Sequence, residues 1–226
     1  KGAIRTEDDH YCRSRLIILE NTQNRCGGVA LTTEYTRQVA DLSKKHGLKF
    51  HLDGARVFNA AAVQRVDVRE LTNPADSVTF CLSKGLCAPV GSVLCGTKEF
   101  IYHARRLRKQ LGGGMRQAGV LAAAGIIALE KMILRLEEDH VHARQLAEGL
   151  ANLPGVVLDY GLPATNMVFV SFSPNNIKNA NQIKEMLANL GILVGVVAER
   201  RLRLVTHYWI NNDEVQKTVS AFKSVL

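Results

Sequence analysis

Apolar residues in the first half of the chain fall into two alternating patterns. Residues 32–47 place them at helical spacing, with a threonine able to cap the start and Gly47 able to end the helix. Short leucine-rich and β-branched runs predict strands at 15–20, 48–53, 77–83 and 90–96. Strand–helix–strand units build mostly parallel sheets with flanking helices, so we predict an α/β fold.

The second half begins with helical patterns and ends in a smaller mixed unit. A helix at about 56–65 precedes the third strand, and residues 97–150 are helical apart from LGGGM at 111–115. Beyond Pro154 the pattern predicts strands at 167–172, 192–198 and 201–207, with helices at about 176–190 and from Asn212. We therefore expect a large domain over 1–116, one long connecting helix over 117–151 and a small C-terminal α+β domain over 152–226.

Hydropathy and cysteine usage restrict the class of protein. The longest nearly uncharged stretch, 120–129, is half of the roughly 20 residues that a bilayer crossing requires, so we expect no membrane partner. The five cysteines form no CxxC pair, which favours reduced thiols in the cytoplasm, with the mitochondrion as the alternative. No HExxH motif occurs, and we expect no metal. The first residues contain neither a methionine nor a signal-peptide core, which suggests a processed or truncated chain.

The positive charge raises the question of nucleic acid. The formal net charge is +8, and basic runs occur at 105–109 and 199–203. Aromatic residues make up only 6% of the chain, and no RNP, zinc-finger or KH signature is present. Arginines that bind small anions explain the charge equally well, so we expect no nucleic-acid partner.

Four motifs carry the candidate chemistry: HLDGAR (51–56), SKGL (83–86), GGGMRQAG (112–119) and RLVTH (203–207). Asp53 ends one predicted strand and Lys84 follows another, so both project beyond the carboxyl edge of the sheet, where α/β proteins bind ligands. A lysine, an aspartate and several arginines facing one cleft suit pyridoxal phosphate. The lysine binds the cofactor covalently, the aspartate keeps the pyridine nitrogen protonated, and arginines hold phosphate and carboxylate.

Each residue also has an ordinary structural explanation. Asp53 can cap the turn that follows its strand, and Lys84 can be a solvated loop lysine. Arg56 can pair with a carboxylate, Arg116 can start a helix, and His10 can be an ordinary polar histidine.

The combination of motifs is more specific. Together with HYCRSRLIILENTQN (10–24) and DSVTFCLSKGLCAPVGSVLCG (76–96), it closely resembles the low-specificity L-threonine aldolases, which are fold-type-I PLP-dependent enzymes of the aspartate-aminotransferase-like superfamily. The resemblance implies the latter part of a fold-type-I large domain followed by the small C-terminal domain. It also implies that a phosphate cup and a stacking histidine come from a more N-terminal portion.

The resemblance assigns a role to each candidate. Lys84 corresponds to the Schiff-base lysine and Asp53 to the carboxylate at the pyridine nitrogen. Arg56 corresponds to an arginine that contacts cofactor and substrate, and Arg203 to the substrate-carboxylate arginine. Arg116 corresponds to an arginine that contacts the phosphate of a neighbouring subunit's cofactor. His10 corresponds to a histidine near the substrate's β-hydroxyl.

The implied function is retro-aldol cleavage of L-threonine or L-allo-threonine to glycine and acetaldehyde in a homo-oligomer, a dimer or tetramer with shared active sites. Two alternatives remain from the sequence. One is another fold-type-I PLP enzyme, either a β-eliminating lyase or an aminotransferase. The other is a non-catalytic basic fragment.

Overall fold

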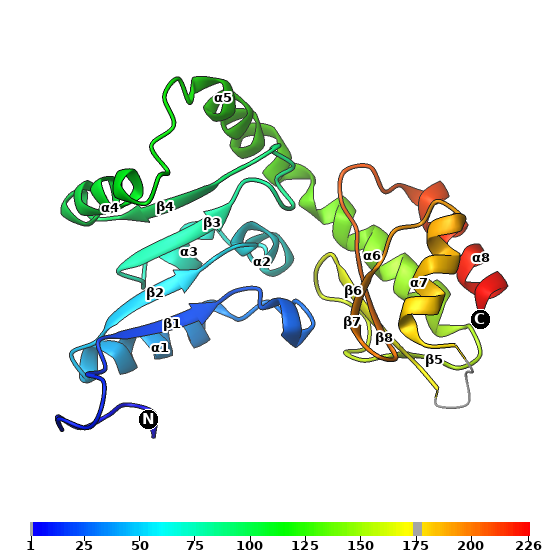
Figure 1. Ribbon diagram of the computed structural model, residues 1–226, viewed down its shortest axis with the longest axis horizontal. Helices are drawn as coiled ribbons and strands as arrows, with labels where there is room; N and C mark the ends of the chain where they lie inside the picture. The colour runs from blue at the N-terminus through cyan, green and yellow to red at the C-terminus, as the bar shows by residue number, and fades with distance from the viewer. Residues whose placement is uncertain (1, 174–177) are drawn as a thin grey trace.

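The computed structural model describes residues 2–173 and 178–226 and contains two four-stranded sheets. Figure 1 shows them side by side, with helix α6 (Leu136–Ala151) running from one toward the other. We call residues 2–116 the N-terminal part and residues 152–226 the C-terminal part. The α/β fold class predicted from the sequence is confirmed, while the domain boundaries stay a prediction.

The first sheet has the strand order β1-β2-β3-β4. Its strands are β1 (Leu16–Glu20), β2 (Lys49–Asp53), β3 (Ser77–Cys81) and β4 (Ser92–Gly96). The first three are parallel, as predicted, and β4 runs antiparallel to β3. The chain returns directly from β3 through the segment that contains Lys84, whereas a parallel partner would require a long crossover.

Helices cover this sheet where the sequence provides caps. The helices are α1 (Thr33–Lys45), α2 (Val57–Gln64) and α3 (Val68–Thr72), with the short 3₁₀ turn η1 (Asn24–Cys26) after β1. The Thr32 side chain accepts a hydrogen bond from the Tyr35 backbone, which confirms the predicted start of α1. Sequence reasoning missed α3, although Asp67 and Glu70 form a capping box there.

The connecting segment is helical but irregular. It contains α4 (Lys98–Gln110), α5 (Gly119–Ile127), the π turn η2 (Ala128–Met132), the 3₁₀ turn η3 (Ile133–Arg135) and α6. The predicted single regular helix over 117–151 is therefore wrong at residues 128–135. The apolar spacing continues through this stretch, so it does not reveal the changed hydrogen-bonding pattern.

The C-terminal sheet is antiparallel, in the order β5-β6-β8-β7. The elements are β5 (Val156–Leu158), β6 (Met167–Phe172), α7 (Ala180–Asn189), β7 (Gly195–Ala198), β8 (Arg201–Val205) and α8 (Asn212–Val225). Its core includes Val170, Ile183, Leu202 and Phe222, all fully buried. The predicted start of α7 near residue 176 lies outside the described residues.

The two parts meet through hydrogen bonds from side chains of one part to backbone carbonyls of the other. The Thr165 hydroxyl donates to the Gly28 carbonyl at 2.8 Å, and the Tyr160 hydroxyl donates to the Arg25 carbonyl at 2.6 Å. Gly28 has φ +66°, and a Cβ there would lie 2.3 Å from the Met167 methyl carbon. The positive φ and the close contact both favour glycine at this position, which brings the loop after β1 against the start of β6. Within the described residues, no helix has the length and apolarity needed to span a bilayer.

Candidate active site

Asp53 and Lys84 lie at one edge of the first sheet. Asp53 is the last residue of β2 and pairs with Thr79 of the parallel strand β3, and Lys84 follows β3 by three residues. One carboxylate oxygen of Asp53 accepts a hydrogen bond from the Ala55 backbone at 3.1 Å. Asp53 thus stabilises the turn after its strand, the structural role that the local sequence suggested, while standing at the ligand-binding edge.

Lys84 opens into a cleft between the two parts. The cleft has a volume of about 400 Å³, and the N-terminal part contributes Arg56 and Lys84 to its wall. The C-terminal part contributes Asn166, His207 and Trp209. The Lys84 side chain is exposed, so the described residues leave its amine open to solvent.

Two arginines make the site strongly positive. Burial lowers the pKa of Arg56, and the charge of Arg203 lowers it further, while Cys81 and Glu20 act in the opposite direction. Arg203 comes from β8 and donates through Nη1 to the Asn24 side chain. Its Nε is buried and has no hydrogen-bond partner among the described residues. Two neighbouring cations and an unused donor are suited to an anionic ligand.

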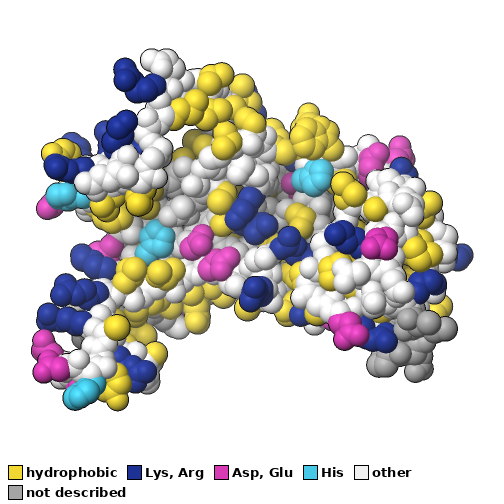
Figure 2. All heavy atoms as spheres, viewed as in Figure 1, with side chains coloured by type: hydrophobic (Ala, Val, Ile, Leu, Met, Phe, Trp, Pro, Cys, Tyr) yellow, Lys and Arg dark blue, Asp and Glu magenta, His cyan; other side chains and the backbone are white. Residues whose placement is uncertain are grey.

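The surface view agrees with this distribution of charge. Figure 2 shows Lys and Arg side chains along the middle of one face, with acidic side chains beside them, and further Lys and Arg side chains at the left of the same view. Part of the positive charge of this face therefore lies where the two parts meet.

His10 and Arg116 are not brought to the cleft. His10 is exposed in the N-terminal segment, and its Nδ1 lies 2.8 Å from Asp8 Oδ1. Arg116 is exposed in the loop between α4 and α5 and makes no hydrogen bond or ion pair with the described residues. The structure therefore groups Lys84, Arg56 and Arg203 with the edge that carries Asp53, and the roles of His10 and Arg116 stay predictions.

Three residues of the cleft wall were missed from the sequence. His207 is the last residue of the RLVTH motif and Trp209 lies two residues beyond it, so the motif itself was the available signal. Asn166 offered no signal, because its place in the cleft depends on how the two parts pack. It is 2% exposed, its Nδ2 donates to the Thr206 carbonyl at 2.9 Å, and its Oδ1 has no partner among the described residues.

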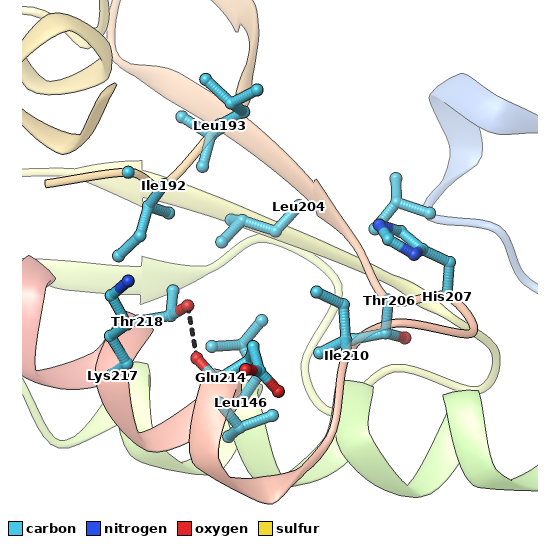
Figure 3. Close-up of a pocket in the computed structure, with 14 residues that line it drawn as sticks. Leu146, Ile192, Leu193, Leu204, Thr206, His207, Ile210, Glu214, Lys217 and Thr218 are labelled. Carbon is cyan, nitrogen blue, oxygen red and sulfur yellow. Dashed lines mark hydrogen bonds between the residues drawn. The ribbon is translucent and has the colours of Figure 1, made fainter. Parts of the chain in front are cut away.

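A second hollow lies between the C-terminal part and helix α6 (Figure 3). Its volume is about 240 Å³, and aliphatic side chains such as Ile192, Leu204 and Ile210 form most of its wall. His207 lines this hollow as well as the cleft. Because the second hollow lacks the grouping of lysine and arginines, the cleft is the better candidate for chemistry.

The donor set in and around the cleft fits pyridoxal phosphate. Lys84 lines the cleft and provides an amine, and Asp53 provides a carboxylate at the same sheet edge. Arg203, whose charge acts on Arg56 in the cleft wall, has a guanidinium nitrogen without a partner among the described residues. These are the groups that the cofactor's aldehyde, pyridine nitrogen and anionic partners require. In residues 2–173 and 178–226, no group of three or more His, Cys, Asp or Glu side chains could hold a metal ion.

Solved structures define the class of fold. A putative L-allo-threonine aldolase from Listeria monocytogenes superposes with a TM-score of 0.78 and 22% identity, covering 92% of this chain and 61% of that one. The Leishmania major threonine aldolase gives a TM-score of 0.75 and 20% identity, covering 97% and 64%. The fold is that of the fold-type-I PLP-dependent enzymes.

The family follows from the sequence comparison. The model of the Beta-eliminating lyase family matches residues 1–175, and the chain belongs to this family. A probable low-specificity L-threonine aldolase 2 from Arabidopsis thaliana is 45% identical over 100% of this chain and 64% of its own length. A low specificity L-threonine aldolase from Escherichia coli (strain K12) is 39% identical over 99% and 64%. The predicted resemblance is confirmed, and the chain spans less than two thirds of each relative.

Proposed function

We propose that the protein containing these residues is a PLP-dependent aldehyde-lyase. It cleaves L-threonine or L-allo-threonine to glycine and acetaldehyde. The observation that carries the proposal is the cleft in which Lys84 and Arg56 face the C-terminal wall, in a chain 45% identical to a relative named as a threonine aldolase.

The residues in and around the cleft have different roles in this reaction. Bound cofactor supplies an electron sink for the pair left on Cα when the Cα–Cβ bond breaks. Lys84 holds the cofactor through its amine, and Asp53 keeps a proton on the pyridine nitrogen. Arg203 binds the substrate carboxylate and so fixes the orientation of the bond to be broken. The aldehyde leaves and Cα gains a proton, which yields glycine.

The β-hydroxyl must lose its proton during cleavage. The resemblance assigns this proton to His10, or to a water that His10 positions. His10 is exposed and lies beside Asp8, whereas His207 lines the same cleft as Lys84. His207 is therefore a second candidate for the acceptor, because a base must reach the proton that it removes.

Assembly and cellular role form part of the same proposal. Arg116 is exposed and has no hydrogen bond or ion pair among the described residues, which suits a contact to a neighbouring subunit's cofactor phosphate in a homo-oligomer, a dimer or tetramer. The reaction would serve threonine breakdown and glycine formation. The five cysteines are all free, which supports a reducing compartment such as the cytoplasm.

Two alternative functions would give different experimental results. A β-eliminating lyase or aminotransferase would form keto acids from amino acids, whereas the proposed enzyme releases an aldehyde from threonine. A basic binding fragment would be retained on polyanions in a salt-dependent way and would show no cofactor spectrum.

The test begins with full-length protein. We expect it to bind PLP, and we expect borohydride to fix the cofactor to Lys84, located by peptide mapping. Lys84→Ala should abolish cofactor absorbance and acetaldehyde release, while Lys98→Ala, on the exposed first turn of α4, should leave both unchanged. A reduced adduct on another lysine would disprove the assigned site. Arg116→Ala should weaken PLP retention, and unchanged affinity would contradict the cross-subunit contact.

A further inference from the structure

Helix α6 contacts both parts of the molecule. It packs on α2 of the N-terminal part and on α8 and β6 of the C-terminal part. Two consecutive residues in its first turns, Asp139 and His140, make polar contacts in the two directions. Neither residue belongs to the motifs that carry the proposed chemistry.

Asp139 connects to the C-terminal wall through its backbone. The Thr206 hydroxyl donates to the Asp139 carbonyl at 2.6 Å. Thr206 in turn exchanges two hydrogen bonds with Asn166 through its backbone, at 2.9 and 3.0 Å, and its hydroxyl makes a longer third one to the Asn166 carbonyl at 3.4 Å. All three residues are at most 2% exposed. Asn166 and the adjacent His207 line the cleft, so this buried chain of hydrogen bonds ends at its wall.

The Asp139 side chain is also linked to the segment that contains Thr206, through Arg135 and Tyr208. Its Oδ1 accepts a hydrogen bond from Arg135 Nη2 at 2.8 Å. The Arg135 guanidinium lies over the Tyr208 ring, 5.1 Å from its centre. Segment 206–209 is therefore fixed by α6 at Thr206 and by Arg135 at Tyr208. Trp209, the next residue, faces the cleft.

His140 connects to the opposite wall. Its Nε2 lies 3.0 Å from Asn59 Nδ2 on α2. Burial lowers the pKa of His140 to about 4, so its neutral ring accepts a hydrogen bond from Asn59 near pH 7. Asn59 lies under the turn that carries Lys84: a Cβ on Gly85 would be 2.9 Å from Asn59 Oδ1 and 3.0 Å from Leu136 Cδ2. Contact with α6 and Asn59 thus fixes the position of the turn that carries Lys84.

We propose that the first turns of helix α6 set the two walls of the cleft independently. The backbone carbonyl of Asp139 acts through Thr206 on the wall formed by Asn166, His207 and Trp209, and the His140 ring acts through Asn59 on the turn that carries Lys84. The kinetic test rests on the proposed function, whereas the spectroscopic test does not.

Thr206 allows a matched pair of variants in the full-length protein. Thr206→Val keeps the shape but removes the hydroxyl, and Thr206→Ser keeps the hydroxyl. We expect the valine variant to raise KM for threonine about 2- to 12-fold, the range for one lost hydrogen bond, with PLP affinity unchanged. The serine variant should restore KM. If the valine variant does not fold, Thr206→Ala provides the same comparison.

His140 provides the complementary pair. His140→Leu removes the acceptor for Asn59, and His140→Gln supplies another. We expect the leucine variant to weaken PLP binding about 2- to 12-fold in an equilibrium titration, with KM for threonine unchanged at saturating PLP. The glutamine variant should bind PLP as the parent does. If the variants at both positions raise KM and the PLP dissociation constant together, the walls are not set separately and the proposal is wrong.

Trp209 gives a readout that requires no activity. It is the single tryptophan of these 226 residues, so its ¹⁹F resonance in 5-fluorotryptophan-labelled full-length protein can be assigned with Trp209→Phe. Thr206→Val should shift or broaden this resonance, while Thr206→Ser and His140→Leu should not. An unmoved resonance in Thr206→Val would overturn the proposal. A moved resonance in a protein without aldolase activity would disprove the proposed function alone.

Discussion

Acid should destabilise this protein through one partly buried histidine, His140. Burial lowers the pKa of His140 from 6.5 to about 4, and the charge of Glu137 only partly opposes the shift. In the unfolded chain the imidazole takes up a proton below about pH 6.5, whereas in the folded protein it stays neutral until about pH 4. Protonation therefore favours the unfolded state, and stability present above pH 6.5 is lost as the pH falls toward 4.

The size of the effect follows from the shift. Each pKa unit corresponds to about 1.4 kcal/mol, so the full loss is about 3 kcal/mol at pH 4 and about 2 kcal/mol at pH 5. A loss of this size is a substantial fraction of the roughly 5–15 kcal/mol that stabilises a typical protein.

The assay compares the parent with His140→Gln. Glutamine keeps an acceptor for Asn59 but does not titrate. Urea unfolding of the full-length proteins at pH 7, 6 and 5 should show the parent losing about 2 kcal/mol more than the variant between pH 7 and 5. Burial raises the pKa of Asp139, so acid acts in the opposite direction there, but this contribution is common to both proteins. A difference between them that does not change with pH would refute the reasoning.

Further predictions concern stability. Leu202→Ala, in the fully buried core of the C-terminal sheet, should cost about 2–5 kcal/mol in urea unfolding, and a cost below 1 kcal/mol would contradict its assigned burial. Gly28→Ala should lower the free energy of unfolding clearly more than Gly47→Ala does. Both glycines have positive φ, worth about 1–2 kcal/mol, but the new Cβ meets Met167 only at Gly28 and finds open space at Gly47. Asp67→Ala should lower the free energy of unfolding by about 1 kcal/mol, because α3 loses its N-terminal cap. An unchanged free energy of unfolding would contradict the capping box.

Local signals in the sequence were enough for most of the fold. Apolar spacing and caps such as Thr32 located the longer helices and strands, because these signals act within a few residues. The three-residue strand β5 and the five-residue helix α3 were missed, since neither holds a full period of an apolar pattern. The antiparallel direction of β4 depends on pairing with β3, which no local pattern specifies.

The candidate site was predictable only in part. Asp53 and Lys84 share an edge because parallel strands end on the same side, and this rule needs no coordinates. The nearness of Arg56 to Arg203 and the place of Asn166 in the cleft depend on how the C-terminal part packs against the first sheet. His10 and Arg116 received their roles from the resemblance alone, and both lie away from the cleft.

The π turn before α6 has a consequence for insertions and deletions. An α-helix advances about 100° per residue, so the wider turn at Ala128–Met132 fixes the rotational phase of every later side chain on α6. Substitutions there preserve this phase, whereas loss of one residue would rotate Asp139 and His140 by roughly a quarter turn, away from Thr206 and Asn59. The number of residues in this irregular stretch, more than their identity, therefore sets where the side chains of α6 point.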